Sequence, residues 1–276
     1  MDPARLLRLH RPRVRAGDAA VLRPRAALGQ RRTHRARALI DALLAVLLAP
    51  SCAACGVLLD APSDGPVCHA CWTAILPMTP PVCDRCGDPL PTWRQHPTDA
   101  GPCARCRRTR HAVDRARTVG EYTGPLRAIV HALKYDGRRS LAEPLAAMMR
   151  DRGAMLLAGA ACAVPVPLHA SRRRHRGFNQ SADLARHLGV PVVHALRRTR
   201  ATATQAELPA AQRRRNVRGA FAPTRAARRL CGAIVVLVDD VSTTGATLDA
   251  CARTLKACGV AEVRALTAAR VVTSRR

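Results

Sequence analysis

The chain has 276 residues, enough for two modest domains or for one domain with an appendage. It carries 46 Lys and Arg against 19 Asp and Glu, a formal charge of +27, and only 2% of its residues are aromatic. The scarcity of aromatic side chains argues against a surface that binds nucleic acid by stacking on its bases. The positive charge is spread along the chain, so it fits either a polyanionic partner or an arginine- and alanine-rich genome.

Twelve cysteines would suit a disulfide-bonded secreted protein, but the N-terminal region does not resemble a secretion signal. No apolar run precedes Leu39. The run 39–50 leads directly into a Cys-x-x-Cys pair and is too short to span a bilayer. We therefore expect a cytoplasmic protein without membrane insertion, in which paired cysteines bind metal.

Residues 1–38 contain eleven arginines and two aspartates, with scattered proline and glycine and little periodicity. This composition predicts a basic, disordered arm. The alternative is that translation starts further in, for example at Val21 or Leu28. From Leu39 apolar residues recur at helical spacing up to Pro50, which predicts a short amphipathic helix over 39–48.

Residues 51–111 are rich in Cys, Pro, Gly and Asp and contain four consecutive Cys-x-x-Cys pairs. The paired cysteines are Cys52 and Cys55, Cys68 and Cys71, Cys83 and Cys86, and Cys103 and Cys106. Two residues between thiolates let a tight turn present both sulfurs to one tetrahedral ion, so the pairs predict two structural Zn²⁺ sites rather than redox chemistry. Gly56 and Gly87 follow the second cysteine of their pairs, where such turns often need positive φ. The spacing leaves open whether neighbouring pairs share an ion or the pairs interleave.

Residues 112–276 have the composition of a globular domain. Apolar runs alternate with amphipathic segments, which predicts an α/β fold with a mainly parallel sheet flanked by helices. The expected strands are 116–122, 161–165, 190–196, 233–238 and 263–267. The expected helices are 124–134, 141–150, 181–188 and 247–257. Part of the basic, turn-rich stretch 197–229 is expected to be a mobile loop.

The most specific motif is the segment 234–247, in which an apolar strand ends in Asp239 and Asp240 and a short loop opens a helix. The loop residues are Ser242, Thr243, Thr244, Gly245, Ala246 and Thr247. Their backbone N–H groups and hydroxyls, with the partial positive charge of the helix N-terminus, are suited to surround a phosphate. The two carboxylates stand at the edge where open α/β sheets bind ligands, and they can accept hydrogen bonds from vicinal ribose hydroxyls. A turn whose threonines merely cap the helix would need fewer hydroxyls and no paired acids.

This segment resembles the phosphoribosyl pyrophosphate motif of type I phosphoribosyltransferases, and the wider sequence resembles the ComF (ComFC) family. Besides the cysteine pairs, the wider resemblance rests on several short motifs in the right order. These are Leu133-Lys134-Tyr135, Val164-Pro165-Val166-Pro167-Leu168-His169, Arg176-Gly177-Phe178-Asn179-Gln180, Thr204-Gln205, Leu208, Arg213, Asn216-Val217 and Phe221. The resemblance implies a five-stranded, mainly parallel phosphoribosyltransferase-like sheet over 112–276. A short helix and a double zinc ribbon over 39–111 would precede it, and the arm 1–38 is unmatched.

The resemblance also implies roles for particular residues. Asp239 and Asp240 are the expected catalytic pair, which holds the ribose while the diphosphate leaves with Mg²⁺. A loop after 161–165 would bind the pyrophosphate, with the candidates Pro167, Leu168, Arg172, Arg176, Asn179 and Gln180. A flexible loop with Gln205, Arg213 and Asn216 would close over the site. Lys134 is expected at the surface unless it reaches the pocket.

Three functions agree with these residues. The first is a phosphoribosyltransferase, a glycosyltransferase that binds phosphoribosyl pyrophosphate with Mg²⁺ and transfers phosphoribosyl to an acceptor that no motif identifies. The second follows from the association of ComF-like proteins with DNA uptake and natural transformation (competence): a non-catalytic protein that handles single-stranded DNA through phosphate contacts. The third is a regulator that senses phosphoribosyl pyrophosphate without turning it over.

Overall fold

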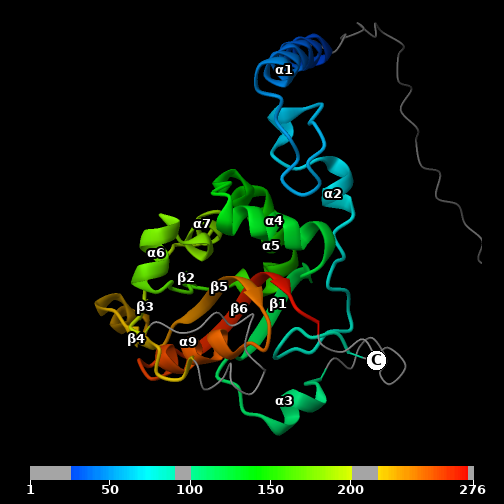
Figure 1. Ribbon diagram of the computed structural model, residues 1–276. Coiled ribbons are helices and arrows are strands. Elements are labelled where there is room, and N and C mark those ends of the chain that lie inside the picture. The colour runs from blue at the N-terminus through cyan, green and yellow to red at the C-terminus, as the bar shows by residue number, and fades with distance from the viewer. Residues whose placement is uncertain (1–25, 91–100, 201–216, 273–276) are drawn as a thin grey trace, which may run out of the picture.

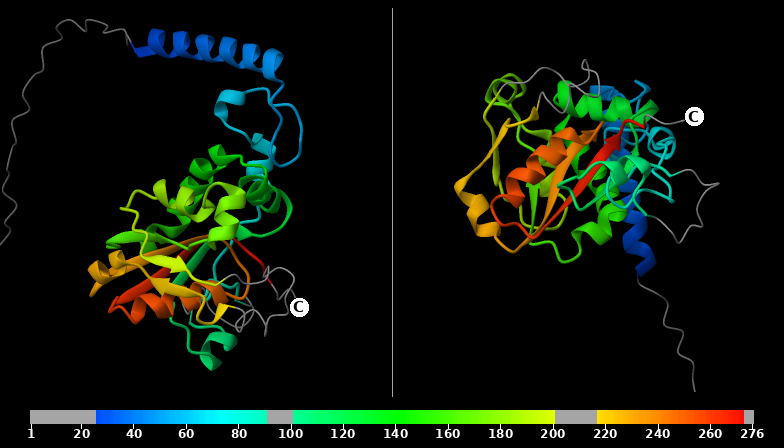
Figure 2. Two further views of the ribbon diagram at one scale, coloured as in Figure 1. Left: turned by 60° about the vertical axis from the view of Figure 1, so that its left-hand side comes forward. Right: turned by 90° about the horizontal axis from the view of Figure 1, so that it is seen from below.

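A computed structural model of the protein describes residues 26–90, 101–200 and 217–272 (Figure 1). A parallel β-sheet with helices on both faces forms the body of the molecule. A cysteine-rich segment runs along one side of this body to a long N-terminal helix that projects away from it (Figure 2). The mainly parallel α/β architecture expected from the sequence is confirmed.

The sheet has the spatial order β1-β6-β5-β2, and every neighbouring pair is parallel. Its strands are β1 (Arg115–Glu121), β2 (Cys162–Pro165), β5 (Ile234–Ser242) and β6 (Glu262–Arg270). Both faces of the sheet are covered, which explains why β5 is apolar at consecutive positions rather than at alternate ones. Val236 and Val238 enter the core on one face, and Val235 and Leu237 enter the core on the other.

The fifth strand expected over 190–196 is reduced, within the described residues, to one parallel bridge between Val192 and Ala163 of β2. Beyond this bridge the chain leaves the sheet, and the N–H of Thr224 donates to the carbonyl of Ala195 at 2.8 Å. The chain instead forms β3 (Leu196–Arg198), which pairs with β4 (Phe221–Pro223) in a separate antiparallel ladder.

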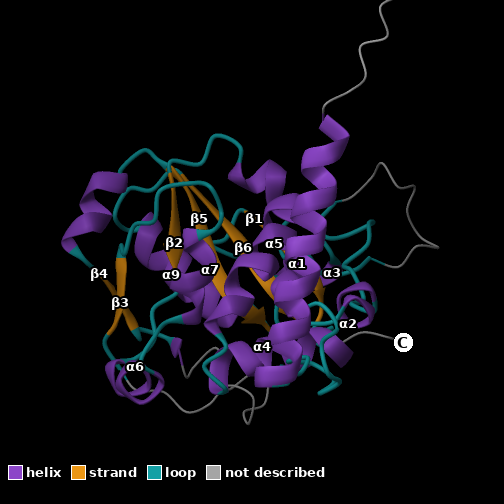
Figure 3. Ribbon diagram, turned by 90° about the horizontal axis from the view of Figure 1, so that it is seen from above, coloured by secondary structure: helices purple, strands orange, loops and turns teal. Residues whose placement is uncertain are grey.

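Helices α4 (Gly124–Tyr135), α5 (Ala142–Leu157) and α7 (Gln180–Arg186) share one apolar core with the sheet (Figure 3). Helix α9 (Ala246–Lys256) packs on the opposite face together with β3 and β4. These four helices agree with the sequence expectation, except that α5 continues to Leu157 instead of ending near Arg150.

Among the described residues of the body, α6 (Ala170–Arg176) and the 3₁₀ helices η3 (Arg139–Leu141) and η5 (Arg225–Leu230) were not expected. Helix α6 contains no buried residue, so it has no apolar stripe from which its period could be recognised.

The N-terminal helix α1 (Ala26–Leu48) starts earlier than Leu39, inside the segment expected to be disordered. Alanine, leucine, glutamine and arginine dominate 26–38, and all four are strong helix formers. The remainder of the expected arm, 1–25, lies outside the described residues. Leu39, Leu43 and Val46 stay 58–83% exposed. Among the described residues, none of the helices has the length and apolar character needed to span a membrane.

The cysteine-rich segment is attached both to α1 and to the body. Asp41 joins it to α1, because its carboxylate accepts hydrogen bonds from the N–H (2.8 Å) and hydroxyl (3.0 Å) of Ser63 in η1 (Pro62–Asp64). Helix α2 (His69–Thr73) packs on α4, whereas α3 (Ala104–Arg108) belongs to the second half of the segment. Between the two halves, Met78 N–H donates to Val119 of β1 at 2.9 Å, so the linker lies against the edge of the sheet.

Candidate functional site

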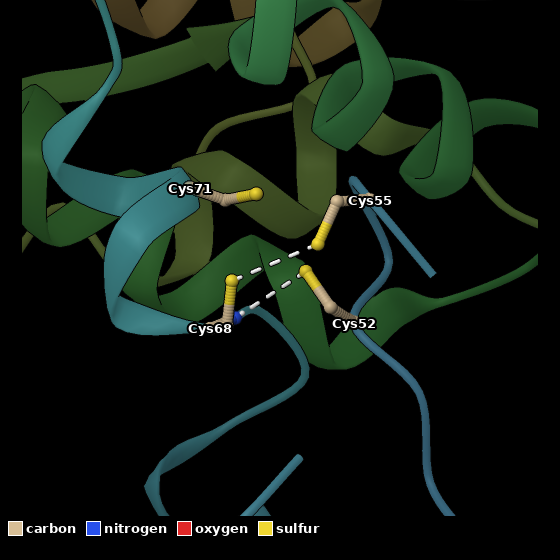
Figure 4. A group of neighbouring side chains, drawn as sticks. All are labelled: Cys52, Cys55, Cys68 and Cys71. Atoms are coloured by element: carbon tan, nitrogen blue, oxygen red, sulfur yellow. Dashed lines mark hydrogen bonds between the residues drawn. The ribbon is translucent and has the colours of Figure 1, made fainter. Parts of the chain in front are cut away.

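The eight paired cysteines form two separate clusters, and in each cluster all the Sγ atoms lie within 4.8 Å of one another. The first cluster consists of Cys52, Cys55, Cys68 and Cys71, and the second consists of Cys83, Cys86, Cys103 and Cys106. In the first, the four side chains converge from two segments of chain (Figure 4). Neighbouring Cys-x-x-Cys pairs therefore combine, which decides between the two arrangements that the spacing left open.

Both clusters have the N–H···S hydrogen bonds and glycine turns that are typical of zinc knuckles. In the first, Cys52 Sγ accepts hydrogen bonds from the N–H groups of Ala54 (3.4 Å) and Cys68 (3.3 Å). In the second, Cys83 Sγ accepts one from Cys103 N–H at 3.2 Å. Such bonds stabilise thiolates, the form of cysteine that binds metal. Gly56 and Gly87 have φ values of +76° and +71°, as expected for the turns of such knuckles.

The sulfurs also need a cation because they lie too close to ionise together. A hydrogen bond from Cys86 lowers the pKa of Cys83 to about 4, and the same contact raises the pKa of Cys86 above its ordinary value. One thiolate is thus favoured at the expense of its neighbour. A divalent ion would remove this conflict, and four thiolates are a common structural zinc set. The clusters therefore support two structural zinc sites.

At the carboxyl end of β5, Asp239 and Asp240 are both more than nine-tenths buried. Asp239 Oδ1 accepts hydrogen bonds from the hydroxyl of Ser181 on α7 at 2.9 Å and from the N–H of Asp240 at 3.0 Å. Asp240 Oδ1 accepts one from Val241 N–H at 2.7 Å. Burial, reinforced by the charge of Asp240, raises the pKa of Asp239 to about 7. Asp239 is therefore held in place by its hydrogen bonds and is partly protonated at neutral pH.

Lys134 neutralises part of this pair: it reaches the site instead of lying at the surface, which is the alternative that the sequence left open. Its Nζ is 2.9 Å from Asp240 Oδ2, and its side chain is only 15% exposed. Val130, one turn earlier in α4, is fully buried, so Lys134 extends the buried face of the helix to the end of β5. Burial alone would lower the pKa of Lys134, but the charges of Asp240 and Asp239 outweigh it and raise that pKa. The ammonium therefore stays charged.

The loop after β5 leads into α9, with Gly245 at φ +76° as the residue before the helix. Thr243 and Thr247 are only partly buried, and Thr244 Oγ1 accepts a long hydrogen bond of 3.4 Å from Ala246 N–H. Like any helix, α9 has N–H groups in its first turn without an intrahelical acceptor, and they carry the positive end of its dipole. A pocket of about 480 Å³ opens beside the loop, between α9 and the segments 109–111 and 217–221. The loop can thus present several donors to an anion.

Two of the candidate pyrophosphate residues, Pro167 and Leu168, follow β2 directly. Asn179 ties this turn to α7, because its Nδ2 donates to Val166 O at 3.1 Å and its Oδ1 accepts from Ser181 N–H at 3.1 Å. Asn179 thereby places Ser181, the residue that hydrogen-bonds Asp239.

Arg176 and Gln180, also pyrophosphate candidates, contact each other: Arg176 Nη1 donates to Gln180 Oε1 at 2.6 Å. The guanidinium of Arg176 also lies 5.0 Å from the ring centroid of Tyr135 on α4. These contacts connect α6 to α4 and α7.

Arg172, the remaining candidate on α6, is electrostatically coupled to Arg198 of β3. Burial lowers the pKa of Arg198, and the charge of Arg172 lowers it further, whereas Asp239 acts in the opposite direction. The guanidinium of Arg198 also lies 5.4 Å from the ring centroid of Phe221. Arg198 therefore belongs to the electrostatic environment of the acid pair.

Sequence reasoning did not assign Lys134, Ser181, Arg198 or Arg270 to this region. Lys134 stands in a recognised motif, but only the packing of α4 reveals its partner. Arg270, the last residue of β6, donates from Nη1 to Ser242 Oγ at 3.1 Å, and no sequence signal pointed to that contact. The flexible-loop candidates Gln205, Arg213 and Asn216 lie outside the described residues.

Comparison with known families gives two matches. The family described as Double zinc ribbon domain matches residues 43–107, and the one described as Phosphoribosyl transferase domain matches residues 174–275. The DNA utilization protein YhgH of Salmonella typhimurium is 34% identical over 212 residues, which span 72% of this chain and 87% of the relative. Competence protein F of Haemophilus influenzae is 31% identical over 208 residues, with the same coverage. The DNA utilization protein YhgH of Escherichia coli K12 is 36% identical over 196 residues, which span 66% of this chain and 81% of the relative.

Proposed function

This chain belongs to the ComF family, in which a double zinc ribbon precedes a phosphoribosyltransferase domain, and we propose that it binds phosphoribosyl pyrophosphate at the loop 242–247. The observation that carries the proposal is the buried acid pair Asp239 and Asp240 near the end of β5, one short loop before the first turn of α9. Donors of the loop suit the 5′-phosphate, and the carboxylates suit the vicinal ribose hydroxyls.

The charge balance of the pair suits a sugar that gains positive charge. Lys134 offsets one carboxylate, so the pair carries at most one net negative charge. In a transfer reaction, the bond from the anomeric carbon to the diphosphate breaks, the diphosphate leaves with the electron pair, and a lone pair of the acceptor forms the new bond. A fixed negative charge beside the ribose stabilises the positive charge that develops meanwhile.

Mg²⁺ would accompany the diphosphate, and the chain offers limited ligands for it. Mg²⁺ prefers oxygen ligands and is often held by one or two carboxylates together with substrate phosphates. Asp239 fits that role, whereas Asp240 Oδ2 is already paired with Lys134. When bound, the ion would neutralise negative charge on the leaving diphosphate.

A thermal-shift experiment tests the proposal. Phosphoribosyl pyrophosphate with Mg²⁺ should raise the melting temperature of the wild-type protein, because a ligand that binds only the folded state stabilises it. The double variant Asp239→Asn, Asp240→Asn should show no shift. Asp151→Asn, which changes an exposed acid on α5, serves as the control and should shift like the wild type. A folded, zinc-loaded wild-type protein without any shift at millimolar ligand would refute the proposal.

A second candidate function is binding of single-stranded DNA, and a cationic face favours it. Helix α6, β3 and β4 lie together at one side of the body (Figure 1). This face, together with η5, which follows β4 directly, carries exposed arginines. They are Arg173, Arg174, Arg197, Arg228 and Arg229. Among the described residues from 166 to 230, Asp183 is the single acid, and it is paired with Arg139 and Arg186. The names of the relatives, DNA utilization protein and competence protein, agree with such a role.

Filter binding of an oligonucleotide across a salt series tests this second function. Replacing Arg173 and Arg174 by Ser should flatten the dependence of log affinity on log salt by about 0.7 for each phosphate that the protein no longer neutralises. The control replaces Arg127 and Arg152, which are exposed on α4 and α5, and should leave the slope unchanged. Equal slopes for the two double variants would mean that this face does not bind DNA.

A further inference from the structure

Arg270 ends β6 directly beside the residue that begins the phosphate loop. The parallel register places Arg270 opposite Ser242. Arg270 Nη1 donates to Ser242 Oγ at 3.1 Å, and the next residue, Val271, donates its N–H to Ser242 O at 2.9 Å. Arg270 is only 2% exposed. The buried guanidinium of Arg270 thus holds the side chain of Ser242, and the backbone N–H of Val271 holds its carbonyl.

The other side of this guanidinium is held by the second cysteine cluster. Arg270 Nε forms an ion pair with Asp88 Oδ1. Asp88 follows the first knuckle of this cluster, formed by Cys83 and Cys86, and its Oδ2 contacts Arg105 Nη2 at 2.6 Å and Cys86 Sγ at 3.5 Å. The orientation of Asp88 therefore depends on the cluster, and the orientation of Arg270 depends on Asp88. A continuous polar chain leads from the second metal site to the loop.

The remaining nitrogen, Arg270 Nη2, is buried and has no hydrogen-bond acceptor among the described residues. Arg270 lines a small cavity of about 30 Å³, and Ser242, Thr244 and Gly245 of the loop line the same cavity. Leaving a buried guanidinium donor unsatisfied costs more than leaving a neutral one. A purely structural arginine would be expected to have this donor satisfied, as most buried polar atoms are.

Arg264 on the same strand shows what a structural arginine looks like here. It pairs with Glu262, and its Nη1 donates to the carbonyls of Leu156 (2.9 Å) and Ala158 (2.6 Å) at the end of α5. It lies at the opposite end of β6 from the loop, and within the described residues none of its buried nitrogens lacks a hydrogen-bond acceptor. Arg264 and Arg270 therefore stand near opposite ends of β6, and Arg264 serves as the structural control for Arg270.

From these contacts we infer that Arg270 is a positioning residue of the phosphate loop, oriented by the second zinc ribbon through Asp88. The ribbon thereby contributes to the affinity for a sugar phosphate, although its cysteines do not line the acid pair. The inference rests on the proposed ligand site at the loop. It assigns a role in ligand binding to the second ribbon alone, because the hydrogen bonds of the first ribbon's described residues do not reach the loop 242–247.

The test compares full-length variants with ribose 5-phosphate as the probe. Asp88→Asn and Arg270→Lys should each weaken its binding about tenfold, the typical effect of losing a charge-assisted hydrogen bond. Arg264→Lys should bind like the wild type. Zinc content and melting temperature establish that each variant is folded and loaded.

A second readout separates positioning from general destabilisation. At saturating ribose 5-phosphate, the ³¹P resonance of the bound phosphate should shift in Asp88→Asn and Arg270→Lys and stay unchanged in Arg264→Lys, because it reports the hydrogen bonds of the phosphate. Wild-type affinity and resonance in the first two variants would overturn the role of Arg270 and leave the ligand site standing. A wild-type protein that does not bind ribose 5-phosphate or phosphoribosyl pyrophosphate would overturn both.

Discussion

The two cysteine clusters use the same ligand set but are joined to the rest of the molecule in different ways. The first contributes Cys52 and Cys71 to an apolar core that it shares with α4 and the sheet. The second forms a small core of its own with Leu90 and reaches the sheet through the ion pairs of Asp84 with Arg117 and of Asp88 with Arg270. Apolar packing tolerates small shifts, whereas a buried ion pair fixes direction. The second cluster is therefore the one suited to orient a functional loop.

Removal of one cluster at a time should give the largest difference between the two. The double variant Cys52→Ser, Cys55→Ser disrupts the first cluster, and the double variant Cys83→Ser, Cys86→Ser disrupts the second. Each should lose about one of two zinc ions, because the two remaining ligands do not hold a structural site. Only the second variant should lose affinity for ribose 5-phosphate, by about tenfold or more. Elemental analysis and calorimetry measure the two effects. Equal loss of affinity in both variants would contradict the proposal that only the second cluster orients the loop.

A change in the attachment of the first cluster should affect stability alone. Asp41→Asn weakens the hydrogen bonds from Ser63 to a buried carboxylate, which should lower the free energy of unfolding by about 1.5–3 kcal/mol. Urea unfolding measures this value, and ribose 5-phosphate affinity should not change. The control is Asp64→Asn in the exposed ion pair with Arg37, which should cost less than about 1 kcal/mol. A weaker ligand affinity in Asp41→Asn would show that the first cluster also reaches the site.

The smallest effect should come from pH, acting at the acid pair and independently of both clusters. Folding raises the pKa of Asp239 to about 7, so its ionisation destabilises the folded state and stability should fall as pH rises from 6 to 8. Relative to Asp239→Asn, the wild-type protein should lose about 1 kcal/mol over this range. Urea unfolding at both pH values measures the difference. The same loss of stability should occur in the variant Cys52→Ser, Cys55→Ser. If the stability difference between the wild type and Asp239→Asn did not change with pH, the raised pKa of Asp239 would be contradicted.

The sequence was most informative where one short segment carries the chemistry. The acid pair, the threonine loop and α9 are contiguous, so their neighbourhood does not depend on the rest of the fold. The cysteine pairs are equally local, although their spacing did not decide which pairs combine. Helix α6 and the early start of α1 escaped prediction because neither shows an apolar period.

Residues that meet only through tertiary packing could not be predicted. Lys134 and Asp240 are brought together by the way α4 crosses the end of β5. Arg270 and Asp88 are 182 positions apart, and either could have been a solvated surface charge. The reduced fifth strand had the composition of a full strand, but the chain after Val192 leaves the sheet and contacts Thr224. In each case the deciding partner lies far away in sequence.

Each cluster draws its four sulfurs from one short stretch of chain, between Cys52 and Cys71 and between Cys83 and Cys106. Closing such short loops costs little entropy, and metal binding supplies most of the folding free energy of modules this small. Both ribbons can consequently load and fold while the ribosome is still adding the strands of the body, since chains fold from the N-terminus during synthesis. Asp88 would then already be fixed when Arg270, the end of the last strand, emerges to meet it.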